Sequence, residues 1–235
     1  MKSTPINTGI IQELKAFPLF KNIDQKTLED LCSLSDVILS SHRDTLFAAD
    51  TKAEYFYIVL SGAYKLSKSS PSGEIIILHF CPPGDLMAAF MMSKDSPIYP
   101  LTSTAIGPSR ALRIPQKTYL KHWTQNIDLI LHVQRLLTER MTTIQSQRAL
   151  TKAPLSSKIA SLLINLIDKQ TAIHDNIQIP IPLTRKEIAD SVGSSVESII
   201  RIMSEWSKKG YISTNEQTIT IANTAKIIEI MKAEQ

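Results

Sequence analysis

Residues 184–210 have the sequence TRKEIADSVGSSVESIIRIMSEWSKKG, and their apolar spacing predicts two consecutive helices joined by a short turn. Thr184–Glu187 has the pattern of a capping box, in which the Thr and Glu side chains accept hydrogen bonds from each other's amides, and Ser194–Glu197 offers a second one. Gly193 lies between the helices, where its conformational freedom suits a tight turn. This spacing predicts a helix-turn-helix. The expected buried positions are Ile188, Ala189, Val192, Ile199, Ile202, Met203 and Trp206.

The second of these helices carries the residues that we expect to recognise DNA. In a helix-turn-helix the N-terminal half of the second helix enters the major groove. Arg201 can donate two hydrogen bonds to guanine O6 and N7, and Glu197 can accept one from cytosine N4. Arg185, Lys186, Lys208 and Lys209 are placed to touch phosphates. The predicted DNA-binding residues are Ser195, Val196, Glu197, Ile200, Arg201, Thr184, Arg185 and Lys186.

The segments on either side complete a small domain. A polar turn at Asn215-Glu216 between two alternating stretches predicts a hairpin, which is the wing of a winged helix-turn-helix. An amphipathic helix and an edge strand that contains two prolines precede the motif. The predicted elements are the helix Leu155–Gln170, the edge strand Asn176–Leu183, the strands Tyr211–Ser213 and Thr218–Ala222, and the final helix Thr224–Lys232.

Residues 116–152 predict a long helix, because no Gly or Pro occurs between Gln116 and Ala153. Its apolar positions recur in alternating steps of four and three, which is the a/d seam of a coiled coil. Two interpretations are open: the seam pairs with a second copy of the chain, or it packs on its own domain. The seam starts at Trp123, and its predicted dimerisation residues are Ile127, Ile130, Gln134, Leu137, Met141 and Ile144.

Residues 1–115 predict a domain rich in β-strands. Short β-prone stretches such as Tyr55–Leu60 and Glu74–Phe80 alternate with turn signals, which indicates an antiparallel barrel or sandwich. Phe17–Phe20 and Asp24–Leu34 predict a helical cap before it, with Asp24 as the N-cap. We therefore expect an α+β protein with a β-rich domain at 1–115, a dimerisation helix at 116–152 and a winged helix-turn-helix at 153–235.

Composition excludes several classes of protein. The 235 residues carry a net charge of +4, and residues 151–235 have ten Lys and Arg against nine Asp and Glu. The net charge therefore does not indicate nucleic-acid binding. Two cysteines are too few for a disulfide framework or a four-thiolate cluster. No apolar stretch suits a membrane span or a secretory signal, so the expected location is the cytoplasm. No nucleophile–base pair, metal-ligand spacing or phosphate loop predicts an enzyme.

The chain resembles the Crp/Fnr family of bacterial transcription regulators over nearly its whole length. The residues that carry the resemblance occur in two independent halves, in the family's order and with a candidate dimer helix between them. In the first half they are Phe17–Phe20, Tyr57–Gly62, Lys65-Leu66, Ser72–Glu74 and Pro83–Asp85, and in the second half Leu183–Ala189, Val192-Gly193 and Val196–Ile202.

This resemblance implies a jelly-roll sensor (a double-stranded β-helix like that of cyclic-nucleotide-binding domains), a dimerisation helix and a winged helix-turn-helix. It implies a homodimer on a palindromic operator, and RNA polymerase is an expected partner. Glu197 and Arg201 match the family's base-reading Glu and Arg, and Val196 matches Fnr-type members. Ile200 replaces a Ser of the Fnr type and can contact a thymine methyl. We expect a half-site with a TGA-like core.

The resemblance also locates an effector pocket and argues against cyclic AMP. Family members that bind the nucleotide have a Gly-Glu pair after Gly-Asp and a later Arg-Ser/Thr pair, because a ribose hydroxyl suits a carboxylate and a cyclic phosphate suits a guanidinium. Here Ala88-Ala89 and Tyr99-Pro100 stand at those places. The iron–sulfur cluster of Fnr needs four cysteines, so it is not expected. The predicted pocket residues are Leu86, Met87, Ala88, Ala89, Tyr99 and Pro100.

A third branch of the family is similar in Met91–Tyr99, which resembles a segment of the denitrification (DNR-type) regulators. Those proteins sense nitric oxide through haem, so haem is an alternative effector group here. No candidate ligand has a spacing that fixes a haem. The sequence favours His79 and Cys81 as core residues over haem ligands, and Met87, Met91 and Met92 as packing over ligation. The candidate ligands are His79, Cys81, His122, His132 and His174.

A different class of function also fits the pattern. Helix pairs with a Gly turn are common in helical domains, and Glu197 and Arg201 are spaced to pair with each other on a solvated face. The alternative is a dimeric signalling adaptor whose winged helix binds protein instead of DNA. A salt-dependent shift of random duplex DNA distinguishes the two, because only a DNA binder produces it.

Overall fold

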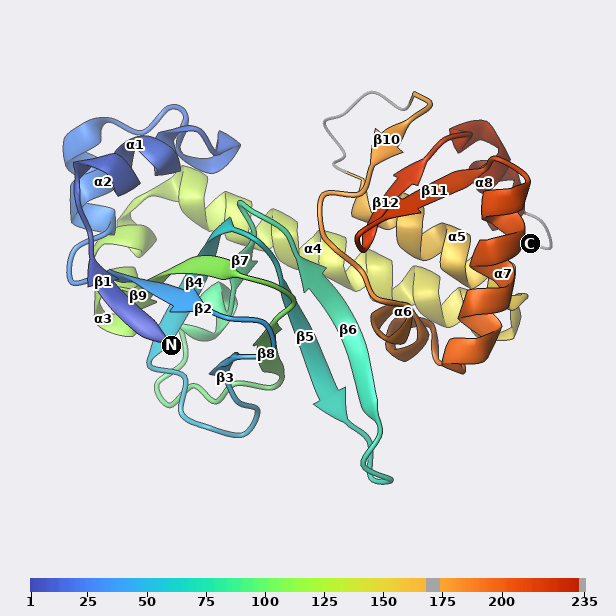
Figure 1. Cartoon of the computed structure of the whole chain (residues 1–235). Coiled ribbons are helices and arrows are strands. Elements are labelled where there is room, and N and C mark those ends of the chain that lie inside the picture. The colour runs from blue at the N-terminus through green and yellow to red at the C-terminus, as the bar shows by residue number, and fades with distance from the viewer. Residues whose placement is uncertain (168–173, 233–235) are drawn as a thin grey trace. The chain divides into compact units, whose positions relative to one another are not determined.

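The computed structural model describes residues 1–167 and 174–232, and the chain divides into two compact units (Figure 1). The first unit comprises Met1–Lys68 and His79–Met141, and the second comprises Ser69–Leu78 and Thr142–Gln235. Among the described residues, no helix combines the length and the apolar character that crossing a membrane requires.

Two β-sheets form the N-terminal part of the fold (Figure 1). One has the strand order β1-β2-β9-β4-β7 and the other β3-β8-β5-β6. The strand β4, which lies between β9 and β7, is almost continuously apolar, because it is covered on both faces. The strands are β1 (Lys2–Pro5), β2 (Asp36–Ser40), β3 (Thr45–Phe47), β4 (Tyr55–Ser61), β5 (Tyr64–Ser69), β6 (Ile75–Cys81), β7 (Leu86–Met87), β8 (Thr102–Ala105) and β9 (Ser109–Pro115).

Helices precede and follow these sheets. Asp24 is the N-cap of α2, as predicted, and its carboxylate accepts from the amide of Thr27 at 3.0 Å. An N-terminal strand and the helix α1 were not predicted. The helices are α1 (Thr8–Lys15), η1 (Pro18–Phe20), α2 (Gln25–Leu31), η2 (Ala89–Met91), α3 (Gln116–His122), η3 (Trp123–Gln125), α4 (Ile127–Ala149) and η4 (Leu150–Lys152).

The prediction of one continuous helix from Gln116 to about Leu150 is wrong. Asn126 has φ −107° and ψ 106°, which is extended backbone, so α4 begins only at Ile127. The break follows from the burial of Trp123, which is fully inaccessible and lies 4.7 Å from Phe56 between ring centroids. Its indole N–H donates to the carbonyl of Leu31 at 3.1 Å. Trp123 therefore belongs to the core of the first unit and not to the seam.

The second unit is helical with a small three-stranded sheet of order β10-β12-β11. The final helix has the predicted bounds, whereas the first helix ends at Leu166 because Ile167 is extended. Residues 168–170 of that predicted helix lie outside the described residues. The elements are α5 (Leu155–Leu166), β10 (Ile177–Gln178), α6 (Arg185–Val192), α7 (Val196–Lys208), β11 (Ile212–Asn215), β12 (Thr218–Ile221) and α8 (Thr224–Lys232).

These elements confirm the predicted fold class. The α+β protein has a jelly-roll of two sheets in its N-terminal half, helices after it, and a helix-turn-helix with a β-hairpin wing at its C-terminal end. The wing turns at Glu216 and Gln217, whose φ angles of 45° and 71° suit a two-residue hairpin loop. Of the predicted edge strand Asn176–Leu183, only β10 (Ile177–Gln178) is a strand, and it pairs with β12.

Candidate nucleic-acid interface

The first helix of the motif begins at the predicted capping box. The hydroxyl of Thr184 accepts from the amide of Glu187 at 3.1 Å, and the carboxylate of Glu187 accepts from the amide of Thr184 at 3.0 Å. The Thr184 hydroxyl also donates to that carboxylate at 2.9 Å. Glu187 is only 2% exposed, so the box is part of the core of the second unit.

Replacing Thr184 by Ala is expected to lower the free energy of unfolding by about 1 kcal/mol, because α6 loses its N-cap acceptor and Glu187 keeps a buried carboxylate with fewer donors. Urea titration followed by far-ultraviolet circular dichroism measures the change. Thr184→Ser retains the hydroxyl and serves as the matched control. Equal losses for the two variants would contradict a capping role for this hydroxyl.

The turn between the helices differs in one detail from the prediction. Gly193 ends α6 with φ 67° and ψ 54°, a left-handed conformation that favours glycine. The N-cap of α7 is Ser195, whose hydroxyl accepts from the amide of Ser198 at 3.3 Å. The second predicted capping box is therefore wrong, because the helix starts one residue later than that pattern requires. Glu197 stays exposed in the first turn of α7.

The helix α7 has one buried face and one exposed face. Ile199, Met203 and Trp206 are buried at steps of four and three, which fixes the opposite face toward solvent. Glu197 and Arg201 are exposed, and Ile200 has 48% of its surface accessible. Within residues 174–232 no ion pair joins Glu197 to Arg201, so both side chains are available to another molecule. The predicted core residues Val192 and Ile202 are only half-buried.

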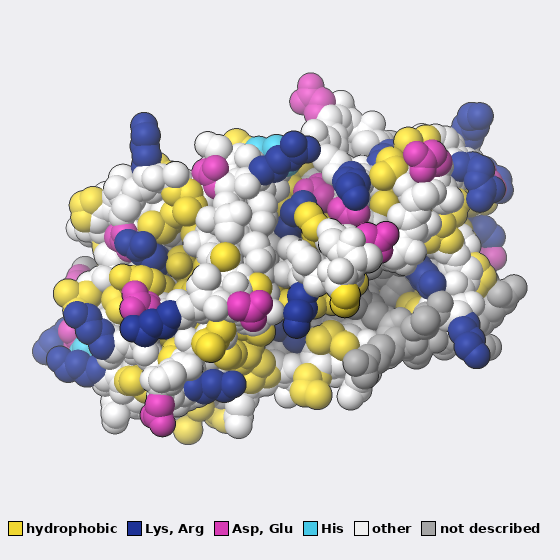
Figure 2. Space-filling view, turned by 90° about the horizontal axis from the view of Figure 1, so that it is seen from below, with side chains coloured by type: hydrophobic (Ala, Val, Ile, Leu, Met, Phe, Trp, Pro, Cys, Tyr) yellow, Lys and Arg dark blue, Asp and Glu magenta, His cyan; other side chains and the backbone are white. Residues whose placement is uncertain are grey.

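The cationic residues around α7 have local partners to different degrees. Arg185 donates to the Thr214 hydroxyl on the wing strand β11 at 3.1 Å, and partial burial lowers the pKa of its guanidinium. Lys186 lies 2.6 Å from the Asp190 carboxylate. The face drawn in Figure 2 likewise carries Lys and Arg side chains dispersed among acidic ones. Arg201 is therefore exposed without belonging to a basic patch on this face.

The predicted dimerisation residues fall on two sides of α4. Ile127 and Met141 are 69% and 62% exposed, and Ile144 is 43% exposed. Gln134 is exposed as well, whereas Leu137 is half-buried. Ile130 packs against the core of the first unit, so its side chain points away from the others. Leu131, which the heptad pattern omitted, is 46% exposed beside them.

The predicted effector-pocket residues are mostly in the core of the first unit. Leu86, Met87, Ala88, Ala89 and Tyr99 are buried, and only Pro100 is exposed. Tyr99 stacks on Phe47 with ring centroids 4.2 Å apart, and its hydroxyl donates to the carbonyl of Tyr55 at 2.6 Å.

Sequence reasoning missed one charged residue next to these positions. Arg140 on α4 donates to the carbonyl of Leu86 at 2.6 Å and lies 3.6 Å from the carboxylate of Asp85. Its side chain is 16% exposed. One signal pointed to it: Arg140 follows Leu129, Val133 and Leu136 at helical spacing, on the face of α4 that packs inward.

Comparison with known proteins agrees with this geometry. Residues 41–126 match the Cyclic nucleotide-binding domain family, and residues 157–230 match the Crp-like helix-turn-helix domain family. The chain is 25% identical over 199 residues to the cAMP-activated global transcriptional regulator CRP of Pasteurella multocida, which covers 84% of this chain and 95% of that protein.

The chain is also similar to two further proteins, one of them an Fnr-type activator. The transcriptional activator protein FnrA of Stutzerimonas stutzeri is 23% identical over 203 residues, which covers 84% of this chain and 82% of FnrA. The solved structure of FixK2 from Bradyrhizobium japonicum superposes with a TM-score of 0.73 at 18% identity and covers 86% of this chain and 100% of that one.

A jelly-roll followed by a winged helix-turn-helix with an exposed recognition helix defines a DNA-binding transcription regulator. The chain belongs to the Crp/Fnr family of such regulators, as its sequence motifs implied. Its named relatives are transcription regulators and not enzymes, which supports the same assignment at the level of the family.

Proposed function

We propose that the chain is a homodimeric, sequence-specific regulator that binds a palindromic operator through α7. The observation that carries the proposal is the exposure of Glu197, Ile200 and Arg201 on the N-terminal half of this helix, where Glu197 and Arg201 form no ion pair with each other. In this proposal residues 1–115 are the sensor, 116–152 the dimerisation segment and 153–235 the DNA reader. RNA polymerase is the further partner that such a regulator contacts.

The second copy of the chain is proposed to cover α4. Ile127, Leu131 and Met141 lie on one side of this helix, and each is more than 40% exposed in the single chain. Gln134 lies between them at heptad spacing. A dimer closed along this face buries these side chains and presents two copies of α7 to half-sites about one helical turn of DNA apart, roughly 34 Å.

The effector of the sensor is proposed not to be cyclic AMP bound in the usual mode. The places of the phosphate-gripping and ribose-binding residues hold Tyr99-Pro100 and Ala88-Ala89, which offer neither a guanidinium nor a carboxylate. A haem does not fit these residues either. Leu86, Met87 and Ala89 are each at most 3% exposed, so these residues leave no space for a macrocycle among them.

Selection of bound sequences from random duplex DNA, with and without cyclic nucleotides and haem, tests the proposal. We expect enrichment of a palindrome with TGA-like half-sites, and binding of random duplex that weakens steeply as salt rises. An adaptor that binds only protein would enrich no sequence and would show no salt-dependent shift.

Replacing Arg201 by Ala is expected to weaken binding to the selected operator by about 1–3 kcal/mol, roughly 5–150-fold, and to relax the preference at one base pair. The loss arises because a bidentate contact to guanine disappears. Gel shift or fluorescence anisotropy at fixed salt measures it. The exposed Lys208 provides the control, since Lys208→Ala should weaken all duplexes alike and reduce the salt slope by about one. If the Arg201→Ala variant bound the operator as tightly as the unmodified protein, Arg201 would not contact a base.

A further inference from the structure

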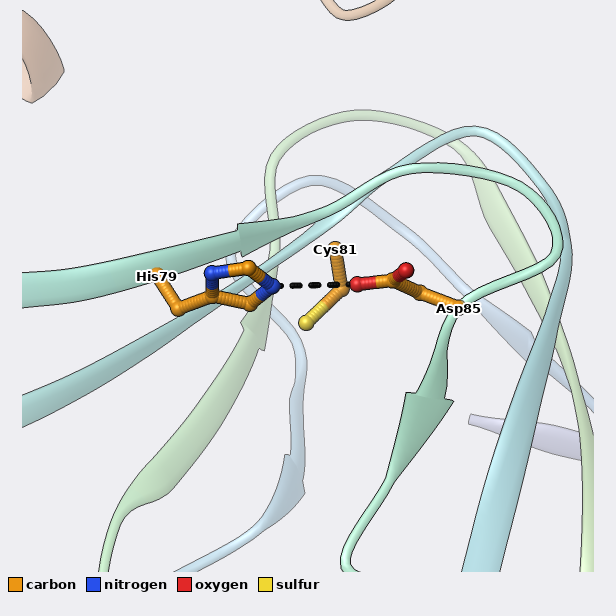
Figure 3. A group of neighbouring side chains, drawn as sticks. All are labelled: His79, Cys81 and Asp85. Atoms are coloured by element: carbon orange, nitrogen blue, oxygen red, sulfur yellow. Dashed lines mark hydrogen bonds and ion pairs between the residues drawn. The ribbon is translucent and has the colours of Figure 1, made fainter. Parts of the chain in front are cut away.

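Three potential metal ligands of the first unit lie together at the end of β6. His79 and Cys81 are two residues apart on this strand, so their side chains share one face of it. The turn that follows brings back Asp85, and Figure 3 shows the His79 imidazole and the Asp85 carboxylate facing each other with the Cys81 side chain beside them. One ligand atom from each residue lies within 4.8 Å of the other two, and His79 Nε2 is 3.0 Å from Asp85 Oδ2.

The backbone holds this arrangement in place. The amide of Val59 donates to the carbonyl of Asp85 at 3.0 Å, and the amide of Gly84 donates to the carbonyl of Val59 at 2.8 Å. Gly84 has φ 89°, and a β-carbon on it would lie 3.2 Å from the ring of Phe17. The loop is therefore tied to the strand β4, and the ligands are positioned before any ion arrives.

We propose that His79, Cys81 and Asp85 form a binding site for one divalent zinc-type ion. One imidazole nitrogen, one thiolate sulfur and one carboxylate oxygen are donors that zinc accepts, and a fourth tetrahedral position is left for water. Zinc–ligand bonds of about 2.0–2.3 Å require neighbouring ligand atoms about 3–4 Å apart, which small side-chain rotations achieve here. A sulfur donor disfavours magnesium and calcium, which prefer oxygen.

The surroundings set how strongly the ion binds. Cys81 is fully buried, and burial together with the Asp85 carboxylate raises the pKa of its thiol, so the thiol releases its proton to solvent when the ion binds. His79 and Asp85 are 30% and 20% exposed, which gives an ion access from solvent. Arg140 is a competing cation, because its guanidinium lies 3.6 Å from the same carboxylate.

Arg140 also connects the site to α4. An ion on Asp85 repels the guanidinium and weakens its attachment to the β6–β7 loop. This step rests on the proposed function, in which α4 forms the dimer face. Binding of the ion would then change how α4 is held and so affect the dimer. Metal binding itself is measured without DNA, so its failure and the failure of the proposed function are separate results.

Titration of the full-length chain, freed of any affinity tag, with Co²⁺ at pH 8 tests the site. We expect one equivalent to bind, with a thiolate-to-cobalt charge-transfer band that Zn²⁺ abolishes by displacement, since zinc binds more tightly than cobalt. Cys81→Ser should lose the band, and His79→Gln and Asp85→Asn should weaken binding by at least about 10–100-fold. The other buried cysteine supplies the control, because Cys32→Ser should leave the band unchanged.

Arg140→Gln is expected to change the metal affinity in the opposite direction. Removing the competing guanidinium should tighten cobalt and zinc binding several-fold, which a merely destabilising substitution would not do. Absence of one-equivalent binding by the unmodified chain overturns the proposal. A charge-transfer band that survives in Cys81→Ser, or that disappears in Cys32→Ser, would equally overturn it, because the ion would then be bound elsewhere.

Discussion

Replacing Ile127 and Met141 together by Glu is expected to convert the proposed dimer into monomers and to weaken operator binding by about 10²–10⁴-fold. The two side chains are 69% and 62% exposed in the single chain, so the substitutions leave the core of the protomer intact. In a dimer each carboxylate would face its counterpart in an apolar seam without a partner. Loss of the second recognition helix then removes the avidity that a two-site operator supplies.

Light scattering and gel shift on the selected palindrome measure the two effects. Gln125→Glu is the control, because it adds one negative charge of the same kind at an exposed residue just outside α4. We expect this control to stay dimeric with unchanged affinity. A double Glu variant that remained a dimer would show that the seam lies on another surface.

Replacing Trp123 by Ala is expected to destabilise the first unit by about 3–5 kcal/mol, a large part of the stability of a typical domain. The indole is fully buried, packs edge-to-face on Phe56 and Phe20, and donates to the carbonyl of Leu31. Its removal leaves a cavity and an unpaired buried acceptor. The break between α3 and α4 depends on this anchor.

Differential scanning calorimetry measures the change, with an expected drop in Tm of roughly 10 °C or more. Leu120→Ala in α3 is the control, because Leu120 is 47% exposed and its truncation should change stability by about 0.5 kcal/mol or less. Equal effects of the two substitutions would contradict the structural role of Trp123.

The elements predicted most closely are those with local signals. The capping box at Thr184, the αL turn at Gly193 and the final helix all follow from interactions within a few residues. The burial of Ile199 and Met203 follows from helical periodicity alone. Exposure of Glu197 and Arg201 then follows, because these residues occupy the opposite side of the same helix.

The wrong predictions concern contacts that are distant in the sequence. A heptad pattern placed Trp123 on the seam, whereas aromatic packing with residues about 70 and 100 positions away draws it into the core. Ile130 fits the seam by spacing, yet it packs against the core of the first unit. Periodicity states which residues share a face, and it does not state what that face meets.

The amino-acid sequence by itself determined the fold class, the helix-turn-helix and the family, because each rests on local spacing and on motifs in a fixed order. Only the tertiary structure decided that His79, Cys81 and Asp85 converge and that Arg140 reaches the same carboxylate from α4. The turn after β6 brings the first three groups together, whereas Arg140 comes from a helix more than 50 residues further along the chain, and no short-range pattern records a contact over that separation.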